Sequence, residues 1–384
     1  MTETKKLKDC CTIIAGQSPE SKYYNSEGDG LPFFQGKADF GDLYPTIRVY
    51  CSKPTKIAEK DDILLSVRAP VGPTNLAPCT VCIGRGLTAI RPSKELLIKY
   101  VLLFFRYFEA QLASKGTGTT FKAITQDVIK NLEIPIPSIS EQQLIVARIE
   151  ELFSSLDNAV ETLQKTKEQL AVYRQAVLKE AFSSCVDSIT MGSIAKMIDP
   201  QPSHRTPPEF ENGVPYIGIG DIDYTEKSIQ FKEARKVNPT VLEEHLRRYT
   251  LHDGDFLMGK IGTIGKPFRV PLPQNYTLSA NVILIQPDSR KIHPEYLFWQ
   301  FSSPLITEQL MEGKNETSQP AFGIQKARLL KIKTCSPEEQ EKIVYGIREK
   351  ISVCENIEQT VNIALAQAEA MRQSILKESF EGRL

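Results

Sequence analysis

The chain has 384 residues, 41% of them hydrophobic and 24% charged, and its 47 basic side chains balance 47 acidic ones. This composition is ordinary for a globular protein of two or three domains. The longest apolar run, Tyr100 to Phe105, is too short to span a bilayer, and the N-terminal stretch MTETKKLKDC has no apolar signal core. We therefore expect a cytoplasmic protein whose eight cysteines are reduced thiols.

Residues 1–136 are expected to form a first α/β module. Short β-rich runs such as DILLSVRAP, LTAIRP and LEIPIP alternate with turns that contain Gly or Pro. One helix is expected to follow Ser93, which is a favourable N-cap residue, and to end near Gly116. This segment carries 18 basic and 14 acidic side chains.

Residues 137–182 are expected to form one long helix. Apolar residues recur every seven positions, and a second row follows three positions after each of them. The first row is Ile149, Leu156, Leu163, Leu170 and Val177, and the second is Leu152, Ala159, Thr166 and Tyr173. Such a seam requires a partner helix, and about 42 helical residues extend over about 60 Å.

Residues 183–334 are expected to form a second module, with a helix that starts at Pro294, and residues 335–384 a second long helix. Its two rows are Ile347, Cys354, Val361, Ala368 and Ile375, and Ile357, Ala364 and Met371. The second module carries 18 basic and 17 acidic side chains. Residues 137–182 carry five basic and seven acidic side chains, and residues 335–384 carry six basic and nine acidic ones. Contact with a polyanion is therefore expected at the modules, and this small imbalance predicts modest affinity.

The two halves of the chain are an internal repeat. When residue n is compared with residue n+198, 16 of the 42 positions from Glu141 to Phe182 are identical. The modules correspond more loosely: GLPFFQGKADF resembles GVPYIGIGDID, and DDILLSVRAPVG resembles GDFLMGKIGTIG. Their apolar positions agree while their polar positions differ. We therefore expect two similar α/β (α+β) modules joined by two long antiparallel coiled-coil helices, with pseudo-two-fold symmetry.

This arrangement suggests a reader of double-stranded DNA. Local dyads in B-DNA allow paired protein modules to contact two half-sites about one helical turn apart. Because the two modules differ in their polar residues, the two half-sites are expected to differ in sequence.

The chain resembles the specificity (S) subunit of type I restriction–modification systems. The resemblance rests on IPIPSISEQQLIVARIEELF with QAVLKEAF, on second copies ending in QSILKESFEGRL, and on DDILLSVRAPVG with CIGRGLTAIRP. The second copy departs from the pattern at KIKTCSPEEQ, which lacks the prolines of IPIPS and leaves the start of that helix open.

The resemblance implies that residues 1–136 and 183–334 are target-recognition domains that each read half of an asymmetric DNA site, and that residues 137–182 and 335–384 are spacer helices. It also implies that these helices dock two methyltransferase subunits, which are joined by restriction/translocase subunits. S-adenosylmethionine, Mg²⁺ and ATP are then expected on the partners only, and this chain is expected to hold no cofactor, no metal and no catalytic residue.

Four sequences that could signal chemistry are better explained as structural. TPPEF at 206–210 lacks the residues with which a methyltransferase holds a flipped adenine, and GKIGTIGK at 259–266 lacks phosphate-loop spacing. Asp288 and Glu312-Gly-Lys314 fit a metal-dependent nuclease only loosely. Cys79-Thr-Val-Cys82 has no second paired motif to complete a zinc site.

Basic and amide side chains on the expected loops are the candidates for DNA contact. Arg68 and Lys260 are expected to occupy matching turns of the two modules. Arginine can bind guanine with two hydrogen bonds, and lysine can contact phosphate. The other candidates are Arg85, Lys115, Lys122, Lys266, Lys314, Lys326, Gln35, Lys37 and Gln319. For each residue taken alone, a solvated surface side chain is the alternative.

Charged residues beside the helix seams are candidates for setting the register of protein partners, with solvent exposure as the alternative. These residues are Glu141, Glu151, Arg174, Lys179, Glu339, Arg372 and Lys377. Two other protein classes stay open: a duplicated structural adaptor that does not bind DNA, and an enzyme whose site has no recognisable motif.

Overall fold

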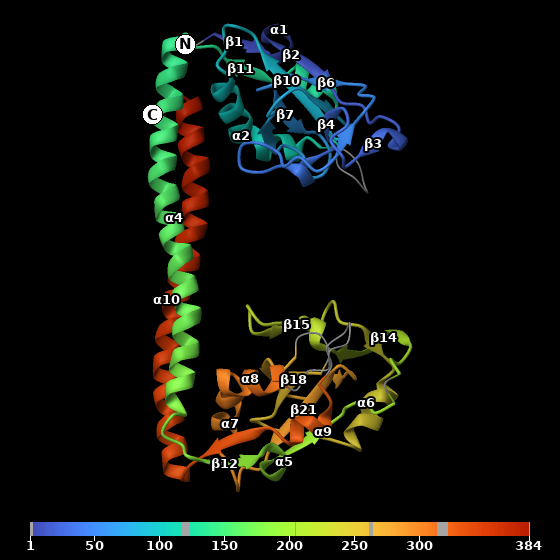
Figure 1. Ribbon diagram of the computed structural model, residues 1–384, viewed down its shortest axis with the longest axis vertical. Coiled ribbons are helices and arrows are strands. Elements are labelled where there is room, and N and C mark those ends of the chain that lie inside the picture. Colours follow the sequence, from blue (N-terminus) through green and yellow to red (C-terminus); the bar gives the residue numbers. More distant parts are fainter. Residues whose placement is uncertain (1–2, 117–122, 204, 261–263, 313–321, 384) are drawn as a thin grey trace. The chain divides into compact units, whose positions relative to one another are not determined.

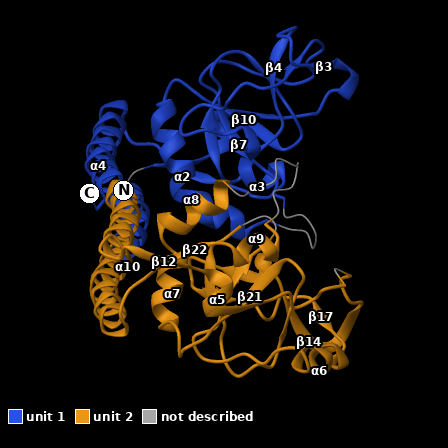
Figure 2. Ribbon diagram, turned by 60° about the horizontal axis from the view of Figure 1, so that its bottom comes forward, with its two compact units in different colours: residues 1–164, 362–384 blue, residues 165–361 orange. Residues whose placement is uncertain are grey.

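The computed structural model describes residues 3–116, 123–203, 205–260, 264–312 and 322–383. The chain divides into two compact units (Figure 2): unit 1 contains residues 1–164 and 362–384, and unit 2 contains residues 165–361. Two long helices, α4 (Ile139–Ala181) and α10 (Pro337–Phe380), each contribute a segment to both units. The predicted fold class, α/β modules with two long helices, is confirmed.

Unit 1 is built on two β-sheets (Figure 1). One has the strand order β2-β10-β7-β8 and is antiparallel, and the other has the order β3-β5-β4-β9-β6. The elements of unit 1 other than α4 and α10 are β1 (Thr4–Lys6), α1 (Leu7–Cys10), β2 (Cys11–Ala15), η1 (Ser21–Tyr23), β3 (Tyr24–Asn25), β4 (Leu31–Phe34), η2 (Lys37–Asp39), β5 (Tyr50–Cys51), β6 (Ile57–Ala58), β7 (Ile63–Ser66), β8 (Thr74–Leu76), β9 (Val81–Ile83), β10 (Leu87–Pro92), α2 (Ile98–Ser114), α3 (Gln126–Lys130) and β11 (Glu133–Pro135). Strands β1 and β11 pair where the chain reaches α4.

Unit 2 repeats this construction. Its four-stranded sheet has the order β13-β21-β18-β19, and a smaller sheet has the order β17-β14-β20. Its elements other than α4 and α10 are β12 (Asp187–Thr190), α5 (Met191–Ile194), β13 (Ala195–Ile198), β14 (Glu209–Ile217), η3 (Ile219–Asp221), β15 (Ile222–Asp223), β16 (Ser228–Ile229), β17 (Lys236–Val237), α6 (Pro239–Leu246), β18 (Phe256–Gly259), β19 (Pro267–Arg269), β20 (Thr277–Leu278), β21 (Val282–Pro287), α7 (Pro294–Phe301), α8 (Pro304–Glu312), α9 (Ile324–Arg328) and β22 (Lys331–Thr334).

The four-stranded sheets are apolar on both faces because each face packs against a different layer. In β7, Ile63 and Leu65 belong to the cluster that contains α2, whereas Leu64 belongs to the cluster of the second sheet. In β18, Phe256 belongs to the cluster that contains α7, whereas Leu257 belongs to the cluster that contains β20. Strands buried on both faces give continuous apolar runs such as ILLS, since successive side chains point to opposite faces.

The module helices differ between the units. Helix α2 is a single helix of 17 residues, whereas α7 ends at Phe301 and α8 begins at Pro304. Proline cannot continue the helical hydrogen bonds, so the Ser-Ser-Pro sequence divides the helix of unit 2. The predicted start at Pro294 is confirmed. The predicted start after Ser93 is wrong, because residues 93–96 form a turn and the helix begins at Ile98.

The long helices are antiparallel within each unit. In unit 1, Arg372 of α10 forms an ion pair with Asp157 of α4, and Leu376 belongs to the same cluster as Ile149. In unit 2, Arg174 lies 2.6 Å from Glu358, and Glu180 lies 3.9 Å from Lys350. Residue numbers rise along one helix as they fall along the other, so the predicted direction is confirmed.

One row of the predicted helix seam is confirmed, and the other is correct only in part, since Leu152, Thr166 and Ala364 are half-buried but its other members are exposed. Ile347, Cys354 and Val361 are buried, but Ile357 and Met371 are 40% and 54% exposed. A further row follows four positions after the first: Ile351 is buried, and Glu358, Leu365 and Arg372 of α10 and Phe153, Val160 and Arg174 of α4 are half-buried. The seam is therefore partly polar, and apolar side chains of the predicted row are exposed to solvent. None of the described helices is long and apolar enough to cross a membrane.

Candidate nucleic-acid interface

Three loops of unit 1 converge at one edge of its sheets. Strands β4 and β9 are parallel, so their carboxyl ends lie together, and Gly84 N donates to Phe34 O at 2.8 Å. A Cβ atom on Gly86 would lie 2.3 Å from Gln35 O, which makes glycine necessary for this close approach. Val67 N donates to Gly86 O at 2.9 Å and brings the chain after β7 to the same edge.

The side chains on these loops are polar and exposed. Gln35 follows β4, Arg85 lies between β9 and β10, and Arg68 follows β7. Ser18 Oγ accepts a hydrogen bond from Arg85 N at 3.2 Å, so the loop after β2 supports the same edge. The structure therefore brings together three DNA-contact candidates that are distant in sequence, and we call Gln35, Arg68 and Arg85 the unit 1 rim.

Two other candidates of unit 1 lie near α2. The charge of Lys37 lowers the pKa of Glu109 on α2, although burial raises that pKa more strongly. Lys115 follows the end of α2, and its Nζ lies 6.0 Å from the centroid of the Phe108 ring. Lys122 lies outside the described residues.

Unit 2 reproduces the backbone of the rim with different side chains. The parallel pair of β14 and β20 matches Tyr216 with Thr277 and Ile217 with Leu278, as β4 and β9 match Phe33 with Cys82 and Phe34 with Ile83. Continuing both registers places Gly218 at the position of Gln35 and Ala280 at the position of Arg85. The amide and guanidinium groups of the unit 1 rim thus have no counterpart at these positions of unit 2.

The expected equivalence of Arg68 and Lys260 is wrong by one residue. Lys260 N donates to Asn281 O and Lys260 O accepts from Phe322 N, and Val67 makes the corresponding bonds with Gly86 and Ile124. Lys260 therefore matches Val67. Its Nζ lies 2.8 Å from Asp199 Oδ2, and the two side chains are only 14% and 17% exposed. Lys260 is committed to a partly buried ion pair, whereas Arg68 is exposed.

The remaining basic candidates of unit 2 lie on other surfaces. Lys266 is exposed, and its Nζ lies 4.2 Å from the centroid of the Tyr224 ring. Lys326 is exposed on α9. Lys314 and Gln319 lie outside the described residues.

A buried carboxylate precedes the central strand of each four-stranded sheet, at the end of the strand opposite the rim loops. Asp62 precedes β7 and receives two 2.8 Å hydrogen bonds from Arg91. Asp255, its counterpart before β18, receives hydrogen bonds from Gln286 Nε2 at 2.6 Å and His252 N at 2.9 Å. Both carboxylates are at least 96% buried. Burial raises the pKa of Asp255, which the neutral amide of Gln286 opposes only in part.

Two buried glutamines connect the long helices to the modules. Gln142 Oε1 accepts from Leu97 N at 2.8 Å and so caps α2, while its Nε2 donates to Glu95 O and Pro137 O. Gln340, its repeat counterpart, accepts from His293 N at 2.9 Å at the start of α7. Sequence reasoning assigned these residues no role, although their identity in both copies was a signal.

Several partner-binding candidates have structural roles within the chain. Glu141 accepts from Ser138 N and Oγ at 2.8 and 2.7 Å, forming a capping box at the start of α4. Arg174 and Arg372 form the ion pairs between α4 and α10 described above. The others lie along the helix surface: Glu151 pairs with Arg148, Glu339 with Lys342, and Lys179 and Lys377 are exposed.

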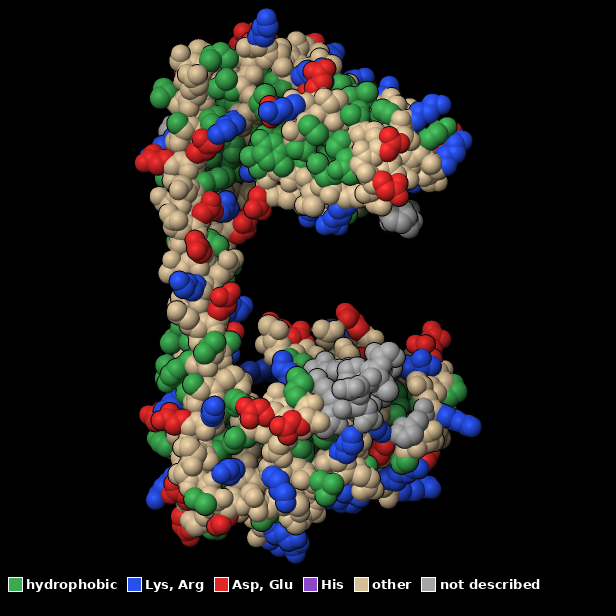
Figure 3. All heavy atoms as spheres, in the orientation of Figure 1, with side chains coloured by type: hydrophobic (Ala, Val, Ile, Leu, Met, Phe, Trp, Pro, Cys, Tyr) green, Lys and Arg blue, Asp and Glu red, His purple; other side chains and the backbone are tan. Residues whose placement is uncertain are grey.

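Large apolar side chains are exposed on the long helices. Figure 3 shows hydrophobic side chains interrupting the polar surface there. Tyr173 and Met371, which are repeat counterparts, are 49% and 54% exposed. The others on the two helices include Leu144, Val172, Tyr345, Val353 and Ile363. Both long helices therefore expose large apolar side chains to solvent.

The described residues contain no group of three or more His, Cys, Asp or Glu side chains that could hold a metal ion. Cys82 is buried in a small cluster with Phe33 and Cys51. Asp288 pairs with Arg290 and Lys291 on a turn. Cys82 and Asp288 thus have contacts within the fold, and Lys314 lies outside the described residues.

Comparison with known proteins identifies both halves of the chain. The family model described as "Type I restriction modification DNA specificity domain" matches residues 2–171 and again residues 189–367. A putative type I restriction enzyme MjaX specificity subunit of Methanocaldococcus jannaschii is 41% identical over 167 residues, which are 43% of this chain and 38% of that protein. The EcoKI specificity subunit of Escherichia coli K12 is 24% identical over 379 residues, covering 91% and 80% of the two chains.

Two solved structures are also similar to this chain. The HsdS subunit from Thermoanaerobacter tengcongensis is 48% identical over 40% of this chain and 37% of that one, with a TM-score of 0.37. The S subunit from M. genitalium is 17% identical over 99% of this chain and 96% of that one, with a TM-score of 0.40. The matches to MjaX and to the T. tengcongensis subunit thus span less than two-fifths of those proteins.

Proposed function

The chain belongs to the family of type I restriction–modification DNA specificity domains, of which it contains two, and we propose that each of them reads one half of a bipartite, asymmetric DNA site. The observation that carries this proposal is the difference between the side chains of the unit 1 rim and those at the matching positions of unit 2. The two units hold the same loops with the same backbone hydrogen bonds but place Gln35 and Arg85 in one and Gly218 and Ala280 in the other. Different side chains on one framework read different bases.

In unit 1, Arg68 and Arg85 are suited to a guanine edge or a phosphate, and Gln35 to an adenine edge in the major groove. Lys37, Lys115 and, in unit 2, Lys266 and Lys326 are suited to phosphate. Lys260 instead holds Asp199 and thereby supports the loop after β13. Lys122, Lys314 and Gln319 complete the proposed contact set.

We further propose that α4 and α10 dock two methyltransferase subunits, through which restriction/translocase subunits join the complex. Tyr173 and Met371 are repeat counterparts with similar exposure, so each repeat presents a comparable apolar position to one copy of the same partner. Lys179, Lys377 and Glu151 lie on the exposed surface of the helices, where they could fix the register of the partner.

The chain itself is proposed to be a non-catalytic, cytoplasmic subunit. S-adenosylmethionine, Mg²⁺ and ATP would then be bound by its partners. The purified chain should leave DNA unchanged when supplied with S-adenosylmethionine or with Mg²⁺ and ATP. Methylation or cleavage by the chain alone would contradict this part of the proposal and favour the enzyme class.

The proposal is tested by co-expressing the chain with its methyltransferase partner in a host without other restriction systems and sequencing the methylated genome. One motif made of two unlike half-sites separated by unread bases is expected. A protein adaptor that does not read DNA would produce no such motif, and modification independent of this chain would contradict the proposal.

A further inference from the structure

Unit 2 contains a cavity of about 1210 Å³ between α7, β19 and its segments of α4 and α10. The divided module helix accounts for part of it. Tyr100 and Tyr296 are counterparts, since each donates at 3.2 Å to the strand before its long helix, and this register matches Arg106 with Ser302. Arg106 donates to Asp42 O at 2.9 Å, whereas Ser302 lies beside the cavity.

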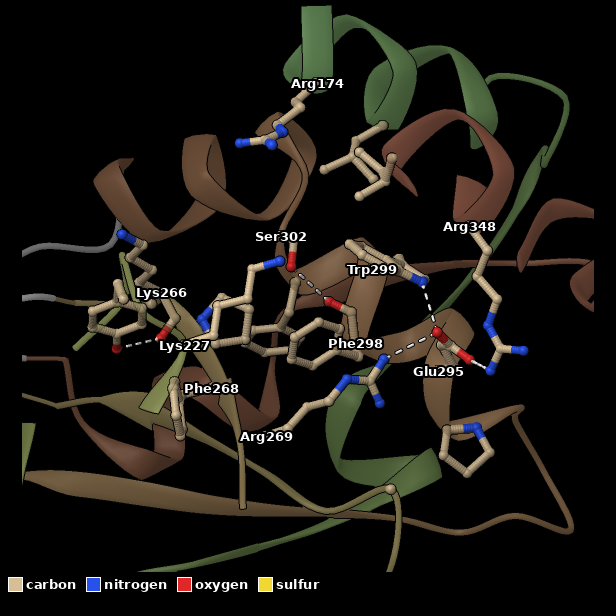
Figure 4. Close-up of a pocket in the computed structure, with 18 of the residues that line it drawn as sticks. Arg174, Lys227, Lys266, Phe268, Arg269, Glu295, Phe298, Trp299, Ser302 and Arg348 are labelled. Atoms are coloured by element: carbon tan, nitrogen blue, oxygen red, sulfur yellow. Dashed lines mark hydrogen bonds and ion pairs between the residues drawn. The ribbon is translucent and has the colours of Figure 1, made fainter. Parts of the chain in front are cut away.

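The cavity is positively charged. Among the described residues, five Lys or Arg side chains and three carboxylates line it: Arg174, Lys227, Lys266, Arg269, Arg348, Asp253, Glu295 and Glu355. Figure 4 shows Glu295 between Arg269 and Arg348, with a third hydrogen bond from Trp299 Nε1 at 3.2 Å. Burial raises the pKa of Glu295, but these two arginines lower it more strongly and keep the carboxylate ionised.

One N–H group of Arg174, a residue of the cavity wall, has no hydrogen-bond acceptor among the described residues. Arg174 Nη2 donates to Glu358 at 2.6 Å, but Arg174 Nε is buried and has no hydrogen-bond partner among the described residues. A buried guanidinium N–H without an acceptor is costly, and a shift of the Arg174 side chain that turned Nε toward an anion in the cavity would remove that cost. Arginine binds phosphate or carboxylate oxygens through such N–H groups.

The cavity also has aromatic walls. Tyr224, Phe268, Phe298, Trp299 and Phe301 line it, and the Arg269 guanidinium lies 4.1 Å from the centroid of the Phe298 ring. Aromatic rings beside arginine and lysine provide stacking surfaces for planar bases and charges for phosphate. The volume is close to that of pockets for small molecules and far too small for a DNA duplex.

We propose that this cavity binds a nucleoside phosphate, with phosphate oxygens on Arg174 and Lys266 and the base against the aromatic wall. The site shares Lys266 with the proposed DNA contacts but no residue with the unit 1 rim, and nucleotide binding by the cavity does not depend on the proposed function. Its ligand would be a free nucleotide, which the chain would hold as a stabilising or regulatory ligand.

The chain contains one tryptophan, Trp299, so its fluorescence reports directly on the cavity. ATP and AMP, added to the full chain, are expected to change this fluorescence saturably, with adenosine much weaker. N-acetyltryptophanamide corrects for light absorbed by the nucleotides. Arg174→Lys keeps a charge for Glu358 but lacks Nε, and should weaken binding about tenfold. Lys266→Gln should weaken it as well.

Arg372→Lys is the matched control, because Arg372 is the repeat counterpart of Arg174 and also forms an ion pair between the long helices, but outside the cavity. It should bind nucleotides as the wild type does. The proposal is overturned by a wild-type chain that does not respond to millimolar ATP or AMP, by equal losses in Arg174→Lys and Arg372→Lys, or by an equal response to inorganic pyrophosphate and ATP. Competitive displacement of ATP by duplex DNA would assign the cavity to DNA instead.

Discussion

At the scale of single residues, the two units use the same positions with different chemistry. The buried aspartate before the central strand is retained, but its partner is Arg91 in unit 1 and Gln286 in unit 2. A charged partner stabilises the ionised carboxylate, whereas an amide gives a hydrogen bond without opposite charge. Because burial raises the pKa of Asp255, the stability of unit 2 should depend on pH.

We predict that Asp255→Asn reduces the pH dependence of stability. Because burial raises the pKa of folded Asp255 above its unfolded value, the folded state holds the proton more tightly, and stability is lost as pH rises through the folded pKa. Asparagine cannot ionise but can still accept from His252 N. The stability of the variant relative to wild type should increase from about pH 4 to pH 7, as measured by urea unfolding at a series of pH values.

Asp62→Asn provides the contrast for this experiment. It removes the charge that pairs with Arg91, so unit 1 should lose about 1–3 kcal/mol at neutral pH. If Asp255→Asn instead destabilised the chain as much as Asp62→Asn and left the pH profile unchanged, the role assigned to burial at Asp255 would be wrong.

A second prediction concerns the unit 1 rim. Arg85→Ala or Arg68→Ala should weaken binding of the assembled complex to its specific duplex and reduce the slope of log K against log salt by about one, if the side chain contacts phosphate. Contact with guanine would instead cost about 1–3 kcal/mol and relax specificity at one base pair. Both outcomes are measured by fluorescence anisotropy over a range of salt concentrations.

Lys260→Ala is the control for the rim variants. Because Lys260 is paired with Asp199, its loss should lower the melting temperature of unit 2 and leave the salt slope unchanged. Equal salt slopes for Arg68→Ala, Arg85→Ala and wild type would remove these arginines from the interface.

The residue scale also shows how far sequence alone could locate the candidate site. Basic loop residues were recognisable, but the convergence of Gln35, Arg68 and Arg85 depends on the parallel pairing of β4 with β9, which local patterns do not encode. The alignment of Arg68 with Lys260 was wrong for a similar reason. Backbone hydrogen bonds define the matching position, and a one-residue offset between polar loops is invisible to apolar periodicity.

At the scale of elements, the long helices were predictable in extent and direction but not in their full contact surface. A 3.5-residue period is satisfied by a second row either three or four positions after the first. The apolar residues Tyr173, Ile357 and Met371 favoured three, but the structure uses four, where Arg174, Glu358 and Arg372 form ion pairs. Polar residues concealed this half-buried row, and Tyr173, Ile357 and Met371 of the predicted row are exposed.

We predict that Tyr173→Ser and Met371→Ser leave the chain folded but prevent assembly. Both side chains are about half exposed, so each change should alter the free energy of unfolding by no more than about 0.5 kcal/mol. Loss of apolar contact area should lower the amount of methyltransferase that copurifies, as measured by size-exclusion chromatography with light scattering.

Leu376→Ala is the matched control on the same helix. Leu376 is 2% exposed in the unit 1 core, and its truncation should cost about 2–5 kcal/mol of stability. Normal assembly by the Tyr173→Ser, Met371→Ser double variant would show that this row does not contact the partner.

At the scale of the whole molecule, the internal repeat is the feature that sequence predicted best. Module, helix, module and helix follow in order, and each unit combines one module with segments of both long helices. Identity at Gln142 and Gln340 marks the two equivalent joints between helix and module. The repeat keeps this framework while the rim side chains vary, which is the arrangement expected when specificity changes by exchange of a module.

The most direct test of this account is to replace residues 1–133 with the corresponding module of another family member and to sequence the methylated genome of the host. The chimera should keep the half-site read by unit 2 and acquire one new half-site in place of the other. Loss or alteration of both half-sites in a chimera that still assembles and methylates DNA would contradict the claim that each module reads its half independently.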